Sequence, residues 1–261
     1  MQNNITVLFL GDVIGKPGRR AVSQFLRNVR ADFIIVNGEN LAGGIGITVS
    51  TAAEMFDLGV DAITTGNHVW KKKEMLHYLT QENRIVRPLN YPEGTPGSGF
   101  TVIDKAGKSL GVANIEGRIF MNAIDCPFRA MNDLLRRENT VPIFVDFHAE
   151  ATSEKIAMGW FLDGRVSVLV GTHTHVQTSD DRILPGGTGY ITDVGMTGPA
   201  DSVIGMAKEG VLHRFTTQLP QKFEVGRDDN EAQGVFVTID ANTRKCTKIE
   251  RIRKKISQRD D

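Results

Sequence analysis

The 261-residue chain carries 31 basic and 31 acidic residues, and this balance argues against a broad charged surface for long nucleic acid or an anionic membrane. Its two cysteines, Cys126 and Cys246, lie far apart without metal-type spacing, which excludes a disulfide framework and a thiolate metal site. A chain of this length can close around one core, so we expect a single domain over residues 1–261.

Short apolar runs alternate with helical patterns in the first third of the chain, which is typical of βα units and a largely buried sheet. The expected strands cover residues 5–10, 33–36 and 62–65. A first helix should open near Pro17, which suits a first helical turn, and a second after Thr48 or Ser50, which can cap a helix. A third helix is expected over residues 74–79.

The middle of the chain departs from this alternation. Residues 100–103 and 110–115 flank a polar stretch with a glycine and predict an antiparallel hairpin, so the sheet should be mixed. The remaining expected elements are a helix after Pro127, a strand over 142–147, a helix over 153–161 and strands over 166–170, 189–192, 234–239 and 246–252. The basic segment 251–255 is expected to be a solvated end.

Residue types that bind metals follow several of the apolar runs directly. In open α/β sheets, ligands bind beyond the carboxyl ends of the strands, because loops from several strands converge there. His173 and His175 stand two residues apart at such an end, and strand alternation predicts that they face the same side. The other candidates are Asp12, Glu39, Asn40, Asn67, His68 and His148. Each alone could be a cap, a turn residue or a hydrogen-bonded core residue, but together they indicate a binuclear metal centre.

The candidate ligands also restrict the metal. A set of imidazole, carboxylate and amide groups without thiolate suits iron, manganese, zinc or cobalt, and we expect two divalent or mixed-valence ions of iron or manganese. Glycines precede the candidates by one or two residues at Gly11, Gly38, Gly66 and Gly171. We expect them to let the backbone turn sharply out of the sheet and pass close to an ion, although glycine also ends strands without such a role.

Several fragments carry a family resemblance, namely Gly11-Asp12, Gly38-Glu39-Asn40, GNHVW at 66–70, DFHAE at 146–150 and GTHTH at 171–175. They resemble the calcineurin-like metallophosphoesterase superfamily, and within it the bacterial YmdB-like branch of 2′,3′-cyclic-nucleotide phosphodiesterases. The resemblance implies an α/β fold, a four-layer αββα sandwich of two mixed β-sheets flanked by helices. It also implies hydrolysis of cyclic nucleotides such as 2′,3′-cyclic AMP.

The same resemblance implies a division of the ligands between two metals. Asp12, Glu39, Asn40 and His175 would hold one metal, and Glu39, Asn67, His148 and His173 the other, with Glu39 bridging. The superfamily commonly has Asp-x-His after the first strand and a bridging aspartate. Here Ile14 stands at the histidine position and Glu39 at the aspartate position, and Asn40 takes the place of the missing imidazole.

We expect a hydroxide that bridges the two metals to attack phosphorus in line with the leaving oxygen. His68 would protonate that oxygen or stabilise the developing charge, or else only form a supporting hydrogen bond. Asp146 and Glu150 could orient ligand imidazoles, although Asp146 could equally be a surface or turn residue. Arg118 and Phe120 could contact phosphate and a base, or simply anchor a loop.

The predicted function is therefore a metal-dependent cyclic-nucleotide phosphodiesterase acting on a small-molecule substrate. Two alternatives remain: a phosphatase or nuclease with the same metals, and a metal-binding regulatory protein that signals through partners. The amino terminus runs into a strand without a signal sequence, which predicts a cytoplasmic protein. No apolar stretch is long enough to span a bilayer, and a homo-oligomer would have the hairpin region as a candidate contact.

Overall fold

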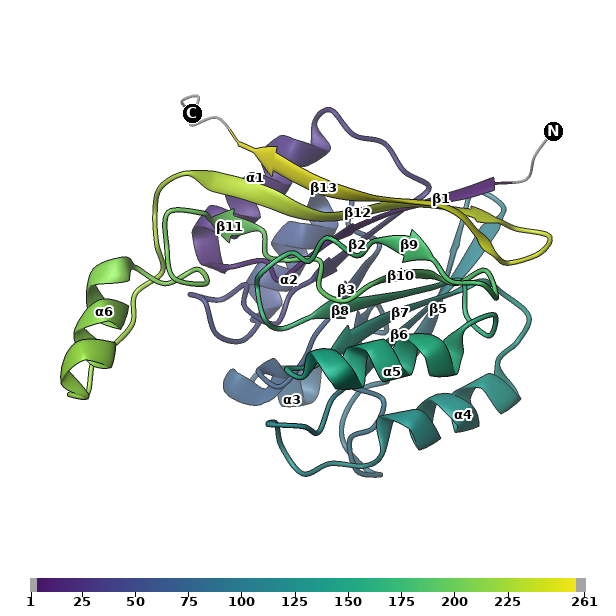
Figure 1. The fold of residues 1–261 in the computed structure, drawn as a ribbon, viewed down its shortest axis with the longest axis horizontal. Coiled ribbons are helices and arrows are strands. Elements are labelled where there is room, and N and C mark those ends of the chain that lie inside the picture. The colour runs from purple at the N-terminus through teal and green to yellow at the C-terminus, as the bar shows by residue number, and fades with distance from the viewer. Residues whose placement is uncertain (1–3, 257–261) are drawn as a thin grey trace.

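The first of two β-sheets contains the amino-terminal strands. The computed structural model describes residues 4–256 (Figure 1). In the first sheet, β1 (Asn4–Leu10), β2 (Phe33–Asn37), β3 (Ala62–Thr64) and β4 (Ile85–Val86) run parallel. The carboxyl-terminal strand β12 (Asn230–Asp240) pairs antiparallel with β1, and it also pairs antiparallel with β11 (Gly198–Pro199) and β13 (Cys246–Lys255).

The second sheet contains the middle of the chain. Its strand order is β5 (Phe100–Lys105), β6 (Lys108–Glu116), β7 (Ile143–His148), β8 (Val168–Thr172), β10 (Gly189–Ile191) and β9 (Arg182–Ile183). Strands β6, β7, β8 and β10 are parallel, whereas β5 and β9 pair antiparallel at the two edges. Both sheets are mixed, as the sequence predicts.

Helices cover the outer face of each sheet. The first sheet packs against α1 (Gly15–Leu26) and α2 (Val49–Asp57), and the second against α4 (Pro127–Arg137) and α5 (Thr152–Leu162). The short elements η1 (Val69–Lys71) and α3 (Met75–Tyr78) follow β3, and α6 (Lys208–Thr217) projects from the layers in Figure 1. The layers thus follow the order helix, sheet, sheet, helix, which confirms the expected αββα sandwich.

The main core lies between the two sheets. In β1, Val7 and Phe9 point into it, while Leu8 and Leu10 point toward the helices on the other face. The ring of Phe9 lies 5.2 Å from that of Phe144 in the second sheet, centroid to centroid. Because both faces of each central strand are buried, these strands are continuous apolar runs rather than alternating patterns.

Three expectations about elements need correction. The hairpin turn is tighter than predicted, since β5 and β6 leave only Ala106 and Gly107 between them, with φ of 50° and 77°. The basic side chains of segment 251–255 are exposed, as expected, but the segment is not an irregular end, because it belongs to β13 and pairs with β12. Helix α6 was not predicted: it buries only Val211, and its N-cap Ala207 supplies no side-chain hydrogen bond.

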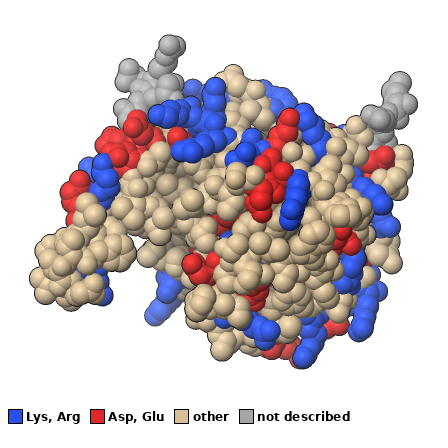
Figure 2. Space-filling model, viewed as in Figure 1, with Lys and Arg blue, Asp and Glu red and all other residues tan. Residues whose placement is uncertain are grey.

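Surface charge is mixed rather than segregated. Figure 2 shows lysine, arginine, aspartate and glutamate side chains interspersed over one face of the molecule, in keeping with the formal net charge of zero. Within residues 4–256, no helix has both the length and the apolar character needed to cross a bilayer.

Candidate metal centre

The predicted ligands gather at one edge of the sandwich. They follow β1, β2 and β3 in the first sheet, and they end or follow β7 and β8 in the second. Parallel strands of both sheets present their carboxyl ends here, so side chains far apart in the sequence converge between the layers.

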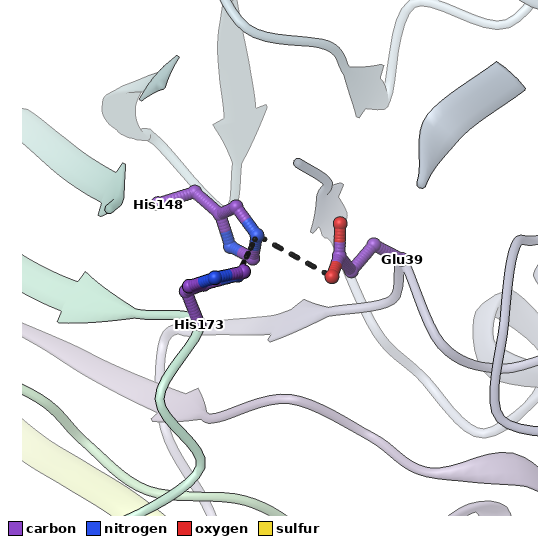
Figure 3. Close-up of side chains that lie close together, drawn as sticks. All are labelled: Glu39, His148 and His173. Atoms are coloured by element: carbon purple, nitrogen blue, oxygen red, sulfur yellow. Dashed lines mark hydrogen bonds and ion pairs between the residues drawn. The ribbon is translucent and has the colours of Figure 1, made fainter. Parts of the chain in front are cut away.

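His148 is at the centre of one group of donors. Its Nε2 atom lies 3.3 Å from Glu39 Oε1, 2.9 Å from Asn67 Oδ1 and 3.0 Å from His173 Nδ1. Figure 3 shows Glu39, His148 and His173 pointing toward one another from three separate segments. Ligand atoms of these three residues all lie within 4.8 Å of one another, a spacing at which one metal ion could contact each.

A second group of donors adjoins the first through Glu39. Asn40 Nδ2 lies 3.2 Å from Glu39 Oε1 and 3.5 Å from His175 Nε2. His175 Nε2 in turn lies 3.6 Å from Asp12 Oδ1. Asp12 Oδ1 is buried without a hydrogen-bond partner in the described part of the chain, which is costly unless a cation satisfies it. Asn40 would bind such a cation through its oxygen, so its amide would have to rotate.

The electrostatics of the cluster follow from burial and close charges. Burial alone would raise the pKa of Glu39, but His148 and His68 hold it well below its usual value. Burial opposes the charged form of His148, yet Glu39 raises the pKa of His148 to about 9. Burial and the neighbouring His148 lower the pKa of His173 to about 3, and burial raises the pKa of Asp12. His173 is therefore neutral and keeps a lone pair for a metal.

Asp146 supports His148 through an intermediate hydroxyl. The Thr172 hydroxyl donates to Asp146 Oδ1 at 2.7 Å and lies 2.9 Å from His148 Nδ1. Asp146 is fully buried, and burial raises its pKa to about 6, so the alternative of a surface or turn residue is wrong. Glu150 Oε2 lies 3.2 Å from His173 Nε2, so this carboxylate orients the imidazole directly, as expected.

His68 lies at the rim of the cluster. Its Nδ1 atom is 2.8 Å from Asn40 Oδ1 and 3.2 Å from Glu39 Oε1, and its backbone N–H donates to Glu39 Oε2 at 3.0 Å. The side chain is 25% exposed. With Nδ1 held by two candidate ligands, Nε2 is the nitrogen that can meet a substrate.

Arg118 and Phe120 lie in the loop after β6, whose Gly117 N–H donates to the carbonyl of His148 at 2.9 Å. The Arg118 N–H donates to the Glu154 carboxylate, and Phe120 is 89% exposed. Among residues 4–256, no hydrogen bond or ion pair links either side chain to the ligand cluster. Their roles in substrate binding stay predictions.

One expectation about the site was wrong. β8 ends at Thr172, and His173 and His175 have φ of 99° and 64°, so strand alternation does not orient them. The four glycines do not have left-handed φ. They allow close packing against protein, since a Cβ on Gly66 would clash with the His148 ring, and their approach to an ion stays a prediction.

Several supporting residues escaped prediction. Thr172, Asn37, Lys155 and Asp193 all hydrogen-bond to the candidate ligands or to the segments that carry them. Asp193 follows the expected strand over 189–192 and could have been found by the same strand-end argument. Lys155 lies within a helix and carries no comparable signal.

Comparisons with known proteins identify relatives of this chain. A model of the YmdB-like protein family matches residues 8–252. The chain is 49% identical over 252 residues to the 2′,3′-cyclic-nucleotide 2′-phosphodiesterase of Bacillus subtilis (strain 168), covering 94% of this chain and 96% of that protein. It is 38% identical over 264 residues to a putative phosphatase/phosphodiesterase of Mycoplasma pneumoniae, covering 97% and 94%.

Solved structures show the same fold. A hypothetical protein from Thermus thermophilus superposes with a TM-score of 0.90 at 43% identity, covering 96% of this chain and 99% of that one. A structure described as a novel phosphatase from Mycoplasma pneumoniae has a TM-score of 0.92 at 37% identity, covering 98% and 95%.

Proposed function

The chain belongs to the YmdB-like protein family, and we propose that it is a binuclear metal-dependent phosphodiesterase that hydrolyses small cyclic nucleotides such as 2′,3′-cyclic AMP. The relatives named as phosphodiesterase and phosphatase support a phosphoesterase. The single observation that carries the metal-dependent chemistry is the convergence of Glu39, Asn67 and His173 on His148 Nε2.

The residues fit two metal ions. Asp12, Glu39, Asn40 and His175 would hold one, and Glu39, Asn67, His148 and His173 the other. Asp12 Oδ1, which has no hydrogen-bond partner among the described residues, and the buried carboxylate of Glu39 supply negative charge, and the neutral His173 supplies a lone pair. The absence of sulfur among these donors favours iron or manganese over softer metals.

Bound metals would activate a water molecule as nucleophile and neutralise charge on the phosphate. The chain's own residues then have two tasks. The carboxylate of Glu39, 3.2 Å from Nδ1, holds the His68 ring and leaves its other nitrogen, Nε2, for the substrate. As water adds to phosphorus and the bond to a ribose oxygen breaks, His68, protonated on both ring nitrogens, donates the Nε2 proton to that departing oxygen, and the proton released by the water restores the protonated ring.

A direct test uses purified protein and matched substrates. The protein, loaded with manganese or iron, is assayed on 2′,3′-cyclic AMP, 3′,5′-cyclic AMP, a phosphate monoester and RNA, and its metal content is measured in the same sample. We expect two metals per chain and the highest kcat/KM on 2′,3′-cyclic AMP. Preference for the monoester or RNA would favour the phosphatase or nuclease alternative, and full metal without hydrolysis would favour a regulatory protein.

A further inference from the structure

The loop that carries His173 and His175 has a backbone conformation that few side chains tolerate. Both residues have positive φ, 99° and 64°, and Thr174 lies between them. Non-glycine residues adopt such conformations only where surrounding contacts fix them. Contacts from outside the loop must therefore hold residues 173–175 in place.

A buried ion pair beneath the loop supplies such contacts. Lys155 in α5 and Asp193 after β10 are each 1% exposed, and Lys155 Nζ donates to Asp193 Oδ2 at 2.6 Å. Lys155 Nζ also donates to the carbonyl of Thr172, immediately before His173, at 2.7 Å. Asp193 Oδ2 accepts from the N–H and the hydroxyl of Thr174 at 3.2 and 2.7 Å. The pair thus holds the residue before the first histidine and the residue between the two.

The surrounding backbone leaves room for this arrangement. A Cβ on Gly171 would clash with the Thr192 carbonyl oxygen and would lie 2.9 Å from Lys155 Cδ, so the absence of a side chain there leaves room for the backbone at Thr192 and for the lysine stem. The other oxygen of Asp193 accepts from the Gly195 N–H at 2.9 Å. Both charged groups are therefore held at several points, and neither is free to move with solvent.

Stability alone gives little reason for a pair in this place. Removing two charges from water is expensive, and apolar side chains of similar volume often stabilise a protein as well or better. Apart from Gly195, the side-chain hydrogen bonds of the pair to other residues end on Thr172 and Thr174. Its contacts are thus concentrated on the loop that presents both imidazoles.

We propose that Lys155 and Asp193 are positioning residues that hold His173 and His175 in the orientation in which both can bind metal. The inference rests on the proposed binuclear function. The pair acts through the backbone and hydroxyl of the loop and does not touch substrate.

The test compares metal binding with stability in five variants. Lys155→Met, Asp193→Asn and Thr174→Val each remove one part of the arrangement, while Thr174→Ser keeps the hydroxyl. Asp163→Asn is the matched control, because that carboxylate also accepts backbone N–H bonds, from Gly186 at 2.7 Å and Thr188 at 3.4 Å, but at the far end of α5. Manganese affinity is measured by competition with a fluorescent chelator, and unfolding midpoints are measured without metal.

We expect the first three variants to bind manganese about 10- to 100-fold more weakly, Thr174→Ser to match the wild type, and Asp163→Asn to lose stability but keep affinity. The visible spectrum of the cobalt-substituted protein, which reports ligand geometry, should change in the first three only. If the variants of Lys155 and Asp193 do not fold, the comparison of Thr174→Val with Thr174→Ser tests the positioning role.

Wild-type affinity and an unchanged cobalt spectrum in the folded variants would overturn the positioning role alone. A wild-type protein that binds no metal would overturn the proposed function as well.

Discussion

Asp146→Asn should misorient His148 as well as weaken the core. Asp146 Oδ1 accepts from the Thr172 hydroxyl at 2.7 Å, and Oδ2 accepts from Asn37 Nδ2 at 3.0 Å. Since the Thr172 hydroxyl donates its hydrogen to Asp146, it can only accept from His148 Nδ1, 2.9 Å away. That bond fixes one proton on Nδ1, so the proton that His148 would give up on binding a metal is the one on Nε2, which faces the candidate ligands.

An amide in place of the carboxylate is unfavourable in either orientation, because one breaks the relay to His148 and the other breaks the contact with Asn37. If its nitrogen replaces Oδ1, the Thr172 hydroxyl must reverse and donate to His148 Nδ1, which moves the proton to Nε2 and blocks the ligand atom. If the nitrogen replaces Oδ2, it faces the Asn37 amide and leaves a buried donor unsatisfied, at about 1–3 kcal/mol. We expect metal affinity to fall about 10- to 100-fold, in line with other residues that orient ligands.

Chelator competition with manganese measures the loss of metal affinity, and unfolding of the metal-free protein measures the loss of stability. Thr172→Val should reproduce the loss of affinity, because it removes the relay itself. Thr64→Val removes another hydrogen bond to Asp146 but leaves the relay intact, so stability should fall more than affinity. An Asp146→Asn protein that binds manganese as tightly as the wild type would refute the reasoning.

Further predictions concern catalysis, packing, thiol chemistry and metal loading. His68→Ala should lower kcat on the order of a hundredfold on 2′,3′-cyclic AMP while metal content survives; unchanged turnover would remove His68 from the mechanism. Gly66→Ala would drive a methyl group into the His148 ring and should lower stability by about 1–3 kcal/mol together with metal affinity, as unfolding and chelator titrations would show. Burial raises the pKa of Cys246 to about 11, so a thiol reagent at pH 8 should label the half-buried Cys126 first. Because the folded pKa of Cys246 exceeds its ordinary value of 9.0, its contribution to stability is complete below pH 9 and is lost as pH rises through 11, which alkaline unfolding curves would detect. Manganese at about 100 times its Kd should stabilise the protein by about 2.7 kcal/mol for one site, visible as a higher unfolding temperature; an unchanged temperature would contradict metal binding to the folded state.

The strands and the placement of candidate ligands were predictable because both follow local rules. A strand buried on both faces is a short apolar run, and the polar residues that follow it lie at the sheet edge. Residues 5–10 and 33–36 thus indicated β1 and β2, and Asp12 and Glu39 followed directly. That both sheets present their ends to the same edge is a property of the whole sandwich, and it came from the family resemblance.

Other features depend on contacts that no local pattern records. The orientation of His173 and His175 comes from left-handed backbone held by Asp12 and Asp193, rather than from strand alternation. In the sequence, Lys155 cannot be distinguished from other lysines on helices, because its hydrogen bond to the carbonyl of Thr172 depends on the tertiary fold. Helix α6 has no capping side chain, and of its apolar residues only Val211 is buried while Leu212 and Phe215 are exposed, so it lacked the signals of a core-facing helix.

Charge joins the two sheets at both ends of the sandwich, but with opposite consequences. At the amino-terminal ends of the parallel strands, Lys105 pairs with Asp61 at 2.8 Å and Lys108 with Asp32 at 2.7 Å, each across the layers and partly exposed. Such exposed pairs contribute only about 0–1 kcal/mol to stability. Each charge in them already has an opposite charge beside it, so a bound cation would add nothing. At the carboxyl-terminal ends, Asp12 and Glu39 are buried, and Asp12 Oδ1 has no hydrogen-bond partner among the described residues. Only the second arrangement gains from a cation, so metal binding should stabilise the two sheets against each other at the end where the chemistry occurs.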